Sequence, residues 1–279
     1  MLIAQITDMH VKPRGELLLE QFDSYSALER AIERINRCSP LPDLLVATGD
    51  LAADGRPEEY AALHHLLDGA RMPYLLIPGN HDDRGNLRDA FPGQPWEDGP
   101  FLLYAVDDWP LRIVALDTVV AGQPHGELCR GRCRWLDETL SQQPDRPTVV
   151  TMHHPPFATG IAHMDGMGLA DPSGLAEIVA KHRQIVRILC GHIHRPIQTM
   201  FAGVATSVAP ATSFQVELKL DDSKGIMLTK EPPAFQLHSW STEGGLLSHT
   251  AYVEDFGALD RPGHSRRTVT KSGLADAGD

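Results

Sequence analysis

Hydrophobic runs and helical patterns alternate along the first two thirds of the chain. Almost wholly apolar runs, such as 44–48 and 148–152, are typical of strands that are buried on both faces of a covered sheet. Between the runs, hydrophobic residues recur at helical spacing, as at Leu28, Ile32 and Ile35. The predicted strands are 2–7, 44–48, 74–77, 101–106, 111–116, 148–152 and 185–190. The predicted helices are 24–37, 57–67, a short one after Arg84, 130–140 and 173–181. This alternation predicts an α/β fold.

The pattern changes beyond residue 202, where shorter runs of alternating hydrophobic and polar residues follow one another. These runs predict antiparallel strands that finish a second sheet. They are 204–208, 214–220, 226–228, 234–240 and 246–253. From residue 260 onward the chain is polar and rich in Gly, Ser, Arg and Lys, so we expect a mobile tail over 260–279.

Charge and composition narrow the possible partners. The 279 residues carry a formal net charge of −12, which disfavours binding to nucleic-acid polymers or anionic membranes. No secretory signal and no apolar stretch of about 20 residues is visible, so we expect a cytoplasmic protein. We expect the four cysteines to be reduced, and the pair Cys129 and Cys133 has no second pair with which to form a zinc site.

Five short polar motifs each follow a predicted strand. They are Asp8-Met9-His10, Gly49-Asp50, Gly79-Asn80-His81-Asp82, His153-His154 and Gly191-His192-Ile193-His194. Open α/β sheets place their sites at the carboxyl ends of parallel strands. The motifs combine carboxylate and amide oxygens with imidazole nitrogens, a mixture that suits a pair of divalent transition metals.

The spacing within the motifs indicates how two ions would be shared. Side chains two residues apart on extended backbone point the same way, so Asp8 and His10 can reach one ion. His192 and His194 repeat this spacing, with one residue for each ion, and Asp50 can bridge the two. Two divalent ions and two carboxylates leave about two positive charges, which a hydroxide and a phosphodiester monoanion would cancel.

Each motif alone is weak, and the prediction depends on all five in one order. The remaining histidines lack comparable context, and we interpret them as ordinary structural or surface residues. They are His64, His65, His125, His163, His182, His238, His249 and His264.

Over about residues 1–215 the pattern D-x-H, G-D, G-N-H-[DE], H and G-H-x-H resembles the calcineurin-like metallophosphoesterase superfamily. The stretches 55–60, 77–83 and 152–156 resemble the class III cyclic nucleotide phosphodiesterases and the related bacterial glycerophosphodiesterases. The resemblance implies a four-layer α/β/β/α sandwich of two mixed sheets. It also implies a catalytic domain over 1–212 and a C-terminal cap or dimer region over 213–259.

The resemblance also implies roles for the motif residues. One metal would be held by Asp8, His10 and His194, a second by Asn80, His153 and His192, and both by Asp50. The metals would be Fe, Mn or Zn. His81 and Asn80 would act in catalysis, and both would contact the substrate together with His194. His81 would aid protonation of the leaving group, and His154 would support the ligands from behind.

The predicted activity is hydrolysis of small phosphodiesters, foremost 3′,5′-cyclic nucleotides such as cAMP, by in-line attack of a metal-bound hydroxide. A glycerophosphodiesterase is the alternative, and a phosphomonoesterase or protein phosphatase is a weaker one. A scaffold that has lost its metals is disfavoured because all seven ligands are present. The resemblance further implies a homo-oligomer, a dimer or larger.

Two groups of side chains bear on the substrate. Four cations follow the motifs closely, and we expect surface solvation for each. They are Lys12, Arg14, Arg84 and Arg195. Phe157, Met164 and Met167 follow the His-His-Pro-Pro turn, where they either form an apolar wall of the substrate pocket or pack their own loop.

Overall fold

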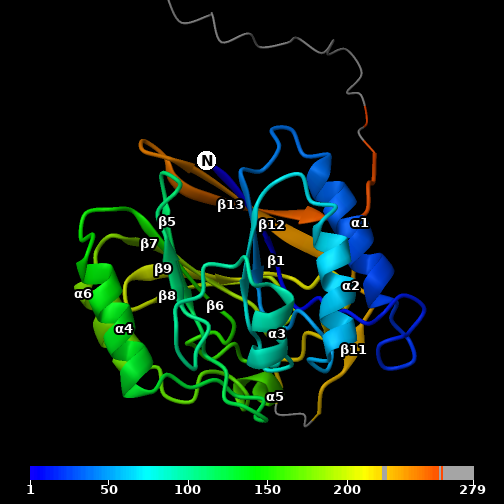
Figure 1. Ribbon diagram of the computed structural model, residues 1–279, viewed down its shortest axis with the longest axis horizontal. Coiled ribbons are helices and arrows are strands. Elements are labelled where there is room, and N and C mark those ends of the chain that lie inside the picture. The colour runs from blue at the N-terminus through cyan, green and yellow to red at the C-terminus, as the bar shows by residue number, and fades with distance from the viewer. Residues whose placement is uncertain (222–224, 258, 260–279) are drawn as a thin grey trace, which may run out of the picture.

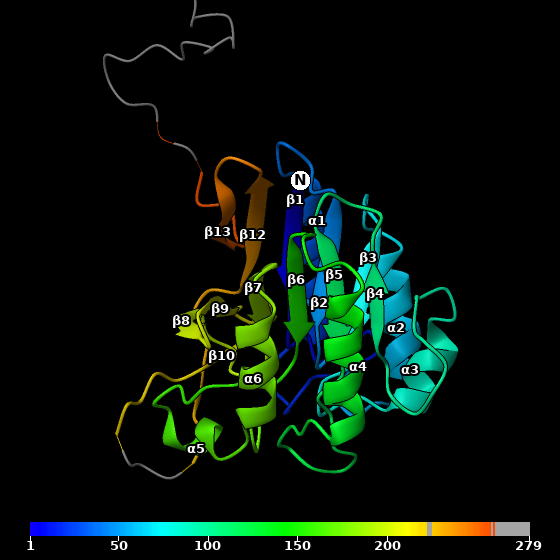
Figure 2. The same ribbon diagram turned by 90° about the vertical axis from the view of Figure 1, so that its left-hand side faces the viewer.

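Two β-sheets lie face to face in the centre of the molecule, and helices cover the outer face of each (Figure 1, Figure 2). The computed structural model describes residues 1–221, 225–257 and 259. In Figure 1, α1 and α2 lie on one side of the strands, and α4 and α6 lie on the other. The α/β class and the four layers predicted from the sequence are therefore confirmed.

The first sheet has the strand order β13-β12-β1-β2-β3. Its strands are β1 (Leu2–Ile6), β2 (Leu44–Thr48), β3 (Tyr74–Ile77), β12 (Ala234–Ser241) and β13 (Gly245–Tyr252). The first three are parallel, and β12 runs antiparallel to β1. Three helices contribute to the hydrophobic cluster on its outer face. They are α1 (Ser24–Asn36), α2 (Pro57–Leu67) and α3 (Arg84–Ala90).

The second sheet has the strand order β4-β5-β6-β7-β9-β8 and is also mixed. Its strands are β4 (Tyr104–Val106), β5 (Arg112–Leu116), β6 (Thr148–Met152), β7 (Ile185–Cys190), β8 (Ile197–Phe201) and β9 (Val204–Val208). The helices α4 (Arg130–Ser141), α5 (Ala162–Asp165) and α6 (Ser173–Lys181) pack on its outer face. A separate two-stranded hairpin joins β10 (Gln215–Val216) to β11 (Leu228–Thr229).

Successive side chains along each strand point to opposite faces of the sheet, so each strand contributes to two layers. In β1, Ala4 and Ile6 pack towards the helices, whereas Ile3 belongs to the cluster between the two sheets. Within this apolar layer Gln5 donates from Nε2 to the Thr48 hydroxyl at 2.9 Å and to the Cys190 carbonyl at 3.0 Å. Gln5 thus links the first sheet to the second close to the strand ends that carry the motifs.

The C-terminal strands depart from the prediction. The sequence predicts that they finish the second sheet, and β9 does so by pairing with β7, but β12 pairs with β1, and β12 and β13 thereby extend the first sheet. The run 214–220 contributes only the two residues of β10, and β8 and α5 were not predicted. Hydrophobic alternation identifies a strand but not its partner, which explains the wrong sheet.

Two further predictions concern the C-terminal part of the chain. The tail over 260–279 lies outside the described residues. The division of the chain at residue 212 stays a prediction. In the part of the chain that the structure describes, none of the helices has the length and hydrophobicity that crossing a bilayer requires.

Candidate metal centre

All five motifs lie at the carboxyl ends of β1, β2, β3, β6 and β7. The two sheets face each other with these ends on the same side, which is the lower side in Figure 2, where the arrow of β6 points. Loops from both sheets therefore bring residues together that are distant in the sequence, such as His10 and His194, which are 184 positions apart.

The backbone turns sharply at the candidate ligands. Five of them have a positive φ, a conformation that non-glycine residues rarely adopt. The angles are 52° at Asp8, 44° at His10, 49° at Asp50, 74° at His192 and 54° at His194. The expected extended geometry is thus wrong at both i, i+2 pairs. Each such residue costs on the order of 1–3 kcal/mol, and strain of this kind concentrates at functional sites.

One group of side chains brings Asp8, His10 and His194 together, with ligand atoms within 4.8 Å of one another. The Nε2 atoms of His10 and His194 are 3.2 Å apart, and His194 Nε2 is 3.4 Å from Asp8 Oδ1. All three residues are buried. Two imidazoles and a carboxylate at these separations form a pocket of suitable donors for one transition-metal ion.

A second group lies beside the first and shares Asp50 with it. His153 Nε2 is 3.2 Å from Asn80 Oδ1 and 3.4 Å from Asp50 Oδ2. The same Asp50 oxygen is 3.6 Å from His10 Nε2. A single carboxylate oxygen therefore lies between the two groups, as a bridging ligand must.

His192 completes the second group. Its ring lies 5.1 Å from that of His153, and its Nε2 atom is buried without any hydrogen-bond partner in the structure. A buried polar atom without a partner is costly, and a metal ion would satisfy it. The residues present therefore fit the metals that the motifs predict.

Backbone carbonyls fix the orientation of two of the imidazoles. His153 Nδ1 lies 2.8 Å from the carbonyl oxygen of Thr48, and His194 Nδ1 lies 3.2 Å from that of Phe214. An N–H at Nδ1 donates to each carbonyl, which directs Nε2 into the centre. Metal-binding histidines are commonly held in this way.

Electrostatics at the centre favour an ionised Asp50, a neutral His192 and a protonated His153. Burial opposes ionisation of Asp50, but His153 and His81 outweigh it and hold the pKa of Asp50 well below its usual range. Burial lowers the pKa of His192 to about 3. Burial also acts on His153, but the Asp50 carboxylate outweighs it and raises the pKa of His153 to about 9. A metal ion that bound His153 at neutral pH would therefore displace a proton.

Two glycines allow the close approach of these elements. Gly49 has a φ of +94°, and a Cβ atom there would overlap the His153 ring. A Cβ atom at Gly79 would overlap the backbone nitrogen and Oδ1 of Asp50. The glycines of these motifs thus leave room for the Asp50 carboxylate and the His153 ring.

His81 faces the centre without belonging to either group of proposed ligands. Its Nδ1 lies 2.7 Å from the Ala53 carbonyl, and its backbone N–H donates to Asp50 Oδ1 at 2.9 Å. The ring lies 4.6 Å from that of His10, edge to face. The contact with Ala53 leaves Nε2 of His81 as the nitrogen available to the cavity that this residue lines.

Asp82 is a supporting residue whose role the sequence did not reveal. Its buried carboxylate accepts backbone N–H groups from Leu51 at 3.0 Å, Ala52 at 3.0 Å and Gly79 at 2.8 Å, and the Tyr60 hydroxyl at 3.0 Å. It thereby ties the loop after β2 to the loop after β3. The tyrosine that ends the stretch 55–60 is the one sequence signal for this contact.

His154 lies behind the centre. Its Nδ1 is 2.8 Å from the Thr118 hydroxyl and its Nε2 is 3.2 Å from the Pro124 carbonyl, so both ring nitrogens have protein partners. Its ring packs 4.7 Å from that of His192. This geometry places His154 among the groups that support the ligands.

A cavity of about 400 Å³ opens directly onto the centre. It is lined by His10, Asp50, Asn80, His81, His192 and His194 and by Leu18, Leu19, Pro124, Met164, Met167, Phe214, Val216, Ile226 and Leu228. Met164 and Met167 thus form part of an apolar wall, whereas Phe157 packs against the cluster under the second sheet. No lysine or arginine is among these described lining residues.

The four cations near the motifs have acidic partners. Lys12 pairs with Asp54 and Glu59, and Arg84 donates two hydrogen bonds to Asp117. In the same way Arg14 contacts Glu29 and Arg195 contacts Glu231. The exposed pair at Arg14 fits the predicted solvated role. The prediction is wrong for Lys12, Arg84 and Arg195, because their side chains are only 13%, 20% and 15% exposed.

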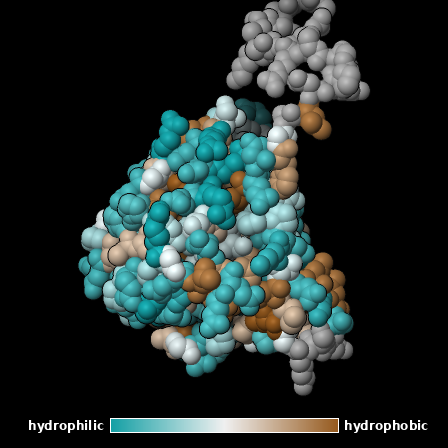
Figure 3. Space-filling view, turned by 90° about the vertical axis from the view of Figure 1, so that its right-hand side faces the viewer, coloured by the Kyte–Doolittle hydropathy of each residue, from teal (hydrophilic) through white to brown (hydrophobic). Residues whose placement is uncertain are grey.

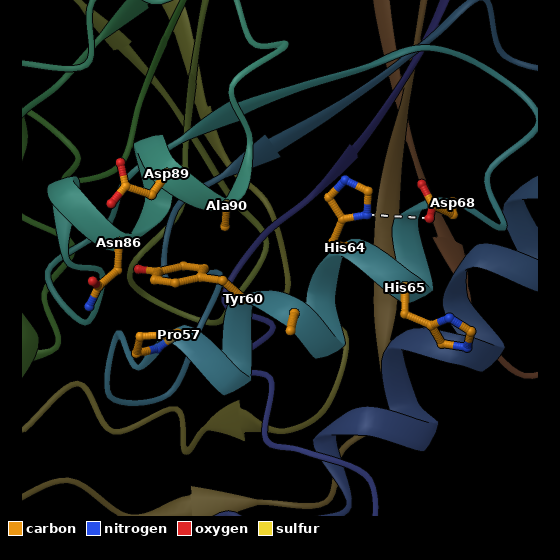
Figure 4. A pocket seen from close by; sticks show the side chains of 9 residues that line it. Pro57, Tyr60, His64, His65, Asp68, Asn86, Asp89 and Ala90 are labelled. Atoms are coloured by element: carbon orange, nitrogen blue, oxygen red, sulfur yellow. Dashed lines mark ion pairs between the residues drawn. The ribbon is translucent and has the colours of Figure 1, made fainter.

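A second hollow, of about 550 Å³, lies on the surface between α2 and α3 (Figure 4). His64 and Asp68 form an ion pair there across 3.3 Å, and His65 is exposed on the same helix. Among the described residues no three metal-binding side chains converge in this hollow. It therefore offers no second candidate for the chemistry of the motifs.

The fold and the paired His and Asp groups define a metal-dependent phosphoesterase scaffold. The sequence model of the calcineurin-like phosphoesterase family matches residues 1–196, and the chain belongs to this family. It is 36% identical to the probable glycerophosphodiester phosphodiesterase GpdQ of Arcobacter nitrofigilis, over 92% of this chain and 94% of that protein. It is 31% identical to the 3′,5′-cyclic adenosine monophosphate phosphodiesterase CpdA of Escherichia coli K12, over 76% of each chain.

Solved structures show the same fold at low sequence identity. A dimetal phosphatase from Danio rerio matches with a TM-score of 0.62 at 14% identity, over 91% of this chain and 99% of that one. A purple acid phosphatase from yellow lupin matches with a TM-score of 0.66 at 14% identity, over 93% of this chain and 52% of that one.

Proposed function

We propose that this protein is a phosphodiesterase that hydrolyses small phosphodiesters at two metal ions. The observation that carries the proposal is the cavity at the centre, whose described lining offers no lysine or arginine. Two divalent ions beside Asp8 and Asp50 leave room for about two negative charges. An attacking hydroxide and a diester monoanion supply two, whereas a monoester dianion would need a further cation.

The seven side chains of the two groups would hold the ions. Asp8, His10 and His194 would bind one, Asn80, His153 and His192 the other, and Asp50 both. The donor set suits Fe, Mn or Zn. When bound, such ions polarise phosphoryl oxygens and lower the pKa of water to about 7.

The protein's own contribution beyond the ligands is positioning and proton transfer. His81 has its Nδ1 held by Ala53, so its Nε2 is placed to protonate the alkoxide that departs from phosphorus. Asn80 and His194 line the same cavity and would orient the phosphate. In the described residues that line the cavity there is no cysteine or serine to serve as a covalent nucleophile.

Cyclic nucleotides such as cAMP are the foremost substrates that we propose. Apart from the polar residues of the centre, the cavity is lined by Pro124, Phe214, leucine, methionine and other aliphatic side chains, which suit the face of a nucleobase. Glycerophosphodiesters are the second candidate. Two relatives named as glycerophosphodiester phosphodiesterases align over 94% and 93% of their lengths, at 36% and 34% identity.

The test compares hydrolysis of cAMP and of glycerophosphoethanolamine by protein that has been stripped of metal and refilled with manganese. A preference for either diester supports the proposed phosphodiesterase and decides between the two substrates. Asn80→Ala removes one proposed ligand and should sharply lower turnover at limiting metal. Full activity of that variant at limiting metal would contradict the assignment.

A homo-oligomer, a cytoplasmic location and the absence of nucleic-acid or membrane partners are also proposals. The exposed edge strand β13 supports the first, because Leu247 and Tyr252 on it are 57% and 50% exposed. The net charge of −12 supports the last. Sedimentation analysis and a salt-dependent vesicle or nucleic-acid binding assay would test them.

A further inference from the structure

Exposed hydrophobic side chains gather beside the mouth of the cavity. Six of the eleven large hydrophobic residues that the structure describes as exposed lie in two segments, the loop between β1 and α1 and the hairpin of β10 and β11. We call them the apolar rim. The apolar rim consists of Leu17, Leu19, Leu218, Leu220, Ile226 and Met227. Figure 3 shows hydrophobic residues concentrated in the lower part of the face that it displays.

The apolar rim continues the wall of the cavity. Leu19 and Ile226 belong to both, since they line the cavity and are also 58% and 39% exposed. Leu220 lies near the loop that precedes α5, since a Cβ atom added at Gly160 would be 3.4 Å from Leu220 Cδ2. An apolar track therefore runs from the metal centre, past Leu19 and Ile226, to the outer surface.

Leu19 is held in an unfavourable backbone conformation at this mouth. Its φ is 50°, in the left-handed region that bulky side chains rarely adopt, and the next residue, Glu20, has a φ of 57°. The leucine is nevertheless mostly exposed to water. Backbone hydrogen bonds between Leu18 and Phe22 close a tight turn here, and this turn holds Leu19 in the left-handed conformation with its side chain in water at the mouth.

Charges along the track do not favour a polar arm of the substrate. Lys219, between two residues of the apolar rim, pairs with Glu217 at 3.0 Å. Arg195, near the base of the hairpin, pairs with Glu231 at 2.7 Å and donates to the Val216 carbonyl. The track therefore matches hydrocarbon better than a charged headgroup.

We propose that the centre also hydrolyses phosphodiesters in which one ester arm is an alkyl chain, and that the apolar rim binds this chain. The proposal rests on the proposed phosphodiesterase. Water adds across one P–O bond, so that the diester gives a phosphate monoester and an alcohol, with the proton of water passing to the departing oxygen. The lining of the cavity could accommodate a nucleobase. Leu218, Leu220 and Met227 lie outside this lining, so only a longer apolar arm of the substrate would contact them.

The test uses methyl, butyl and octyl p-nitrophenyl phosphate on the manganese-loaded protein, below the concentration at which the octyl ester forms micelles. Each methylene that leaves water entirely should raise kcat/KM by about three- to fourfold. Partial exposure reduces this gain, and we expect at least about a tenfold rise from methyl to octyl. Equal kcat/KM values for the three esters would overturn the proposal while leaving the phosphodiesterase intact.

Two variants distinguish binding of the alkyl chain at the apolar rim from a general preference of the protein for hydrophobic substrates. Leu19→Asn keeps a residue that tolerates the left-handed conformation and should lower the ratio of octyl to methyl kcat/KM at least threefold. Leu247→Asn, at a similarly exposed leucine on β13, is the matched control and should leave the ratio unchanged. An unchanged ratio in Leu19→Asn, with an altered sedimentation coefficient, would show that a second copy covers the apolar rim and would overturn the proposal. Hydrolysis of none of the three esters would overturn the proposed function itself.

Discussion

The substitution Gly79→Ala tests how much the proposed centre depends on the position of the Asp50 carboxylate. The backbone at Gly79 lies outside the left-handed region, so alanine is compatible with it, and the conflict is with Asp50. The added Cβ would overlap the nitrogen and Oδ1 of Asp50 and lie 2.9 Å from its Cγ. Overpacking costs about 1–3 kcal/mol and occasionally more, and the overlap with a backbone atom places Gly79→Ala at the upper end of this range or above it.

The functional effect should exceed the effect on stability. Relief of the overlap moves the Asp50 carboxylate, and a displacement of about 1 Å at a catalytic centre costs on the order of 100-fold in rate. Both proposed metal groups depend on Asp50, so the affinity for both ions should fall. Urea unfolding measures the loss of stability, and calorimetric metal titration with turnover of bis(p-nitrophenyl) phosphate measures the functional loss.

Gly93→Ala is the matched control. Gly93 also lies outside the left-handed region, and a Cβ atom there would meet nothing within 4 Å. This variant should keep the stability, the metal affinity and the turnover of the parent protein. Wild-type metal affinity and turnover in Gly79→Ala would refute the reasoning, and so would an equal loss in both variants.

Three further predictions follow from single residues. His81→Gln should still bind both metals, as elemental analysis would show. Its turnover of alkyl diesters should fall about 100-fold or more, and its turnover of diesters with p-nitrophenolate as the leaving group should fall less. An equal loss for both leaving groups would exclude proton donation by His81. Below pH 9 the metal displaces a proton from His153, so metal affinity should rise with pH, by up to about tenfold per unit for one proton, and calorimetry in two buffers should detect its release. Gly174→Ala in α6 should raise the free energy of unfolding by about 0.5–1 kcal/mol, since its Cβ would meet Cys133 Sγ at an ordinary 3.6 Å; destabilisation in urea would contradict this.

The parallel strands and their motifs could be predicted because local signals agree with the tertiary structure there. The runs 44–48 and 148–152 are apolar throughout, and the structure places β2 and β6 over the same residues. Each motif follows such a run directly, so the rule for strand ends in α/β sheets brings the ligands together.

Other features depend on contacts that are distant in the sequence. The pairing of β12 with β1 joins Gln236 to Gln5, and alternation within either strand cannot specify it. The positive φ angles at Asp8 and His10 are imposed by the loops around the centre, against the preference of the residues. The four hydrogen bonds to Asp82 come from three separate segments and likewise require the folded chain.

The most direct test of the central claim is a titration of metal-stripped protein with manganese. Hydrolysis of bis(p-nitrophenyl) phosphate and of p-nitrophenyl phosphate is followed at each ratio of metal to protein. Two proposed metal groups that share Asp50, in a cavity without lysine or arginine, predict diesterase activity that saturates at two ions per chain and exceeds the monoesterase activity. Full activity with one ion or none, or faster hydrolysis of the monoester, would contradict the account.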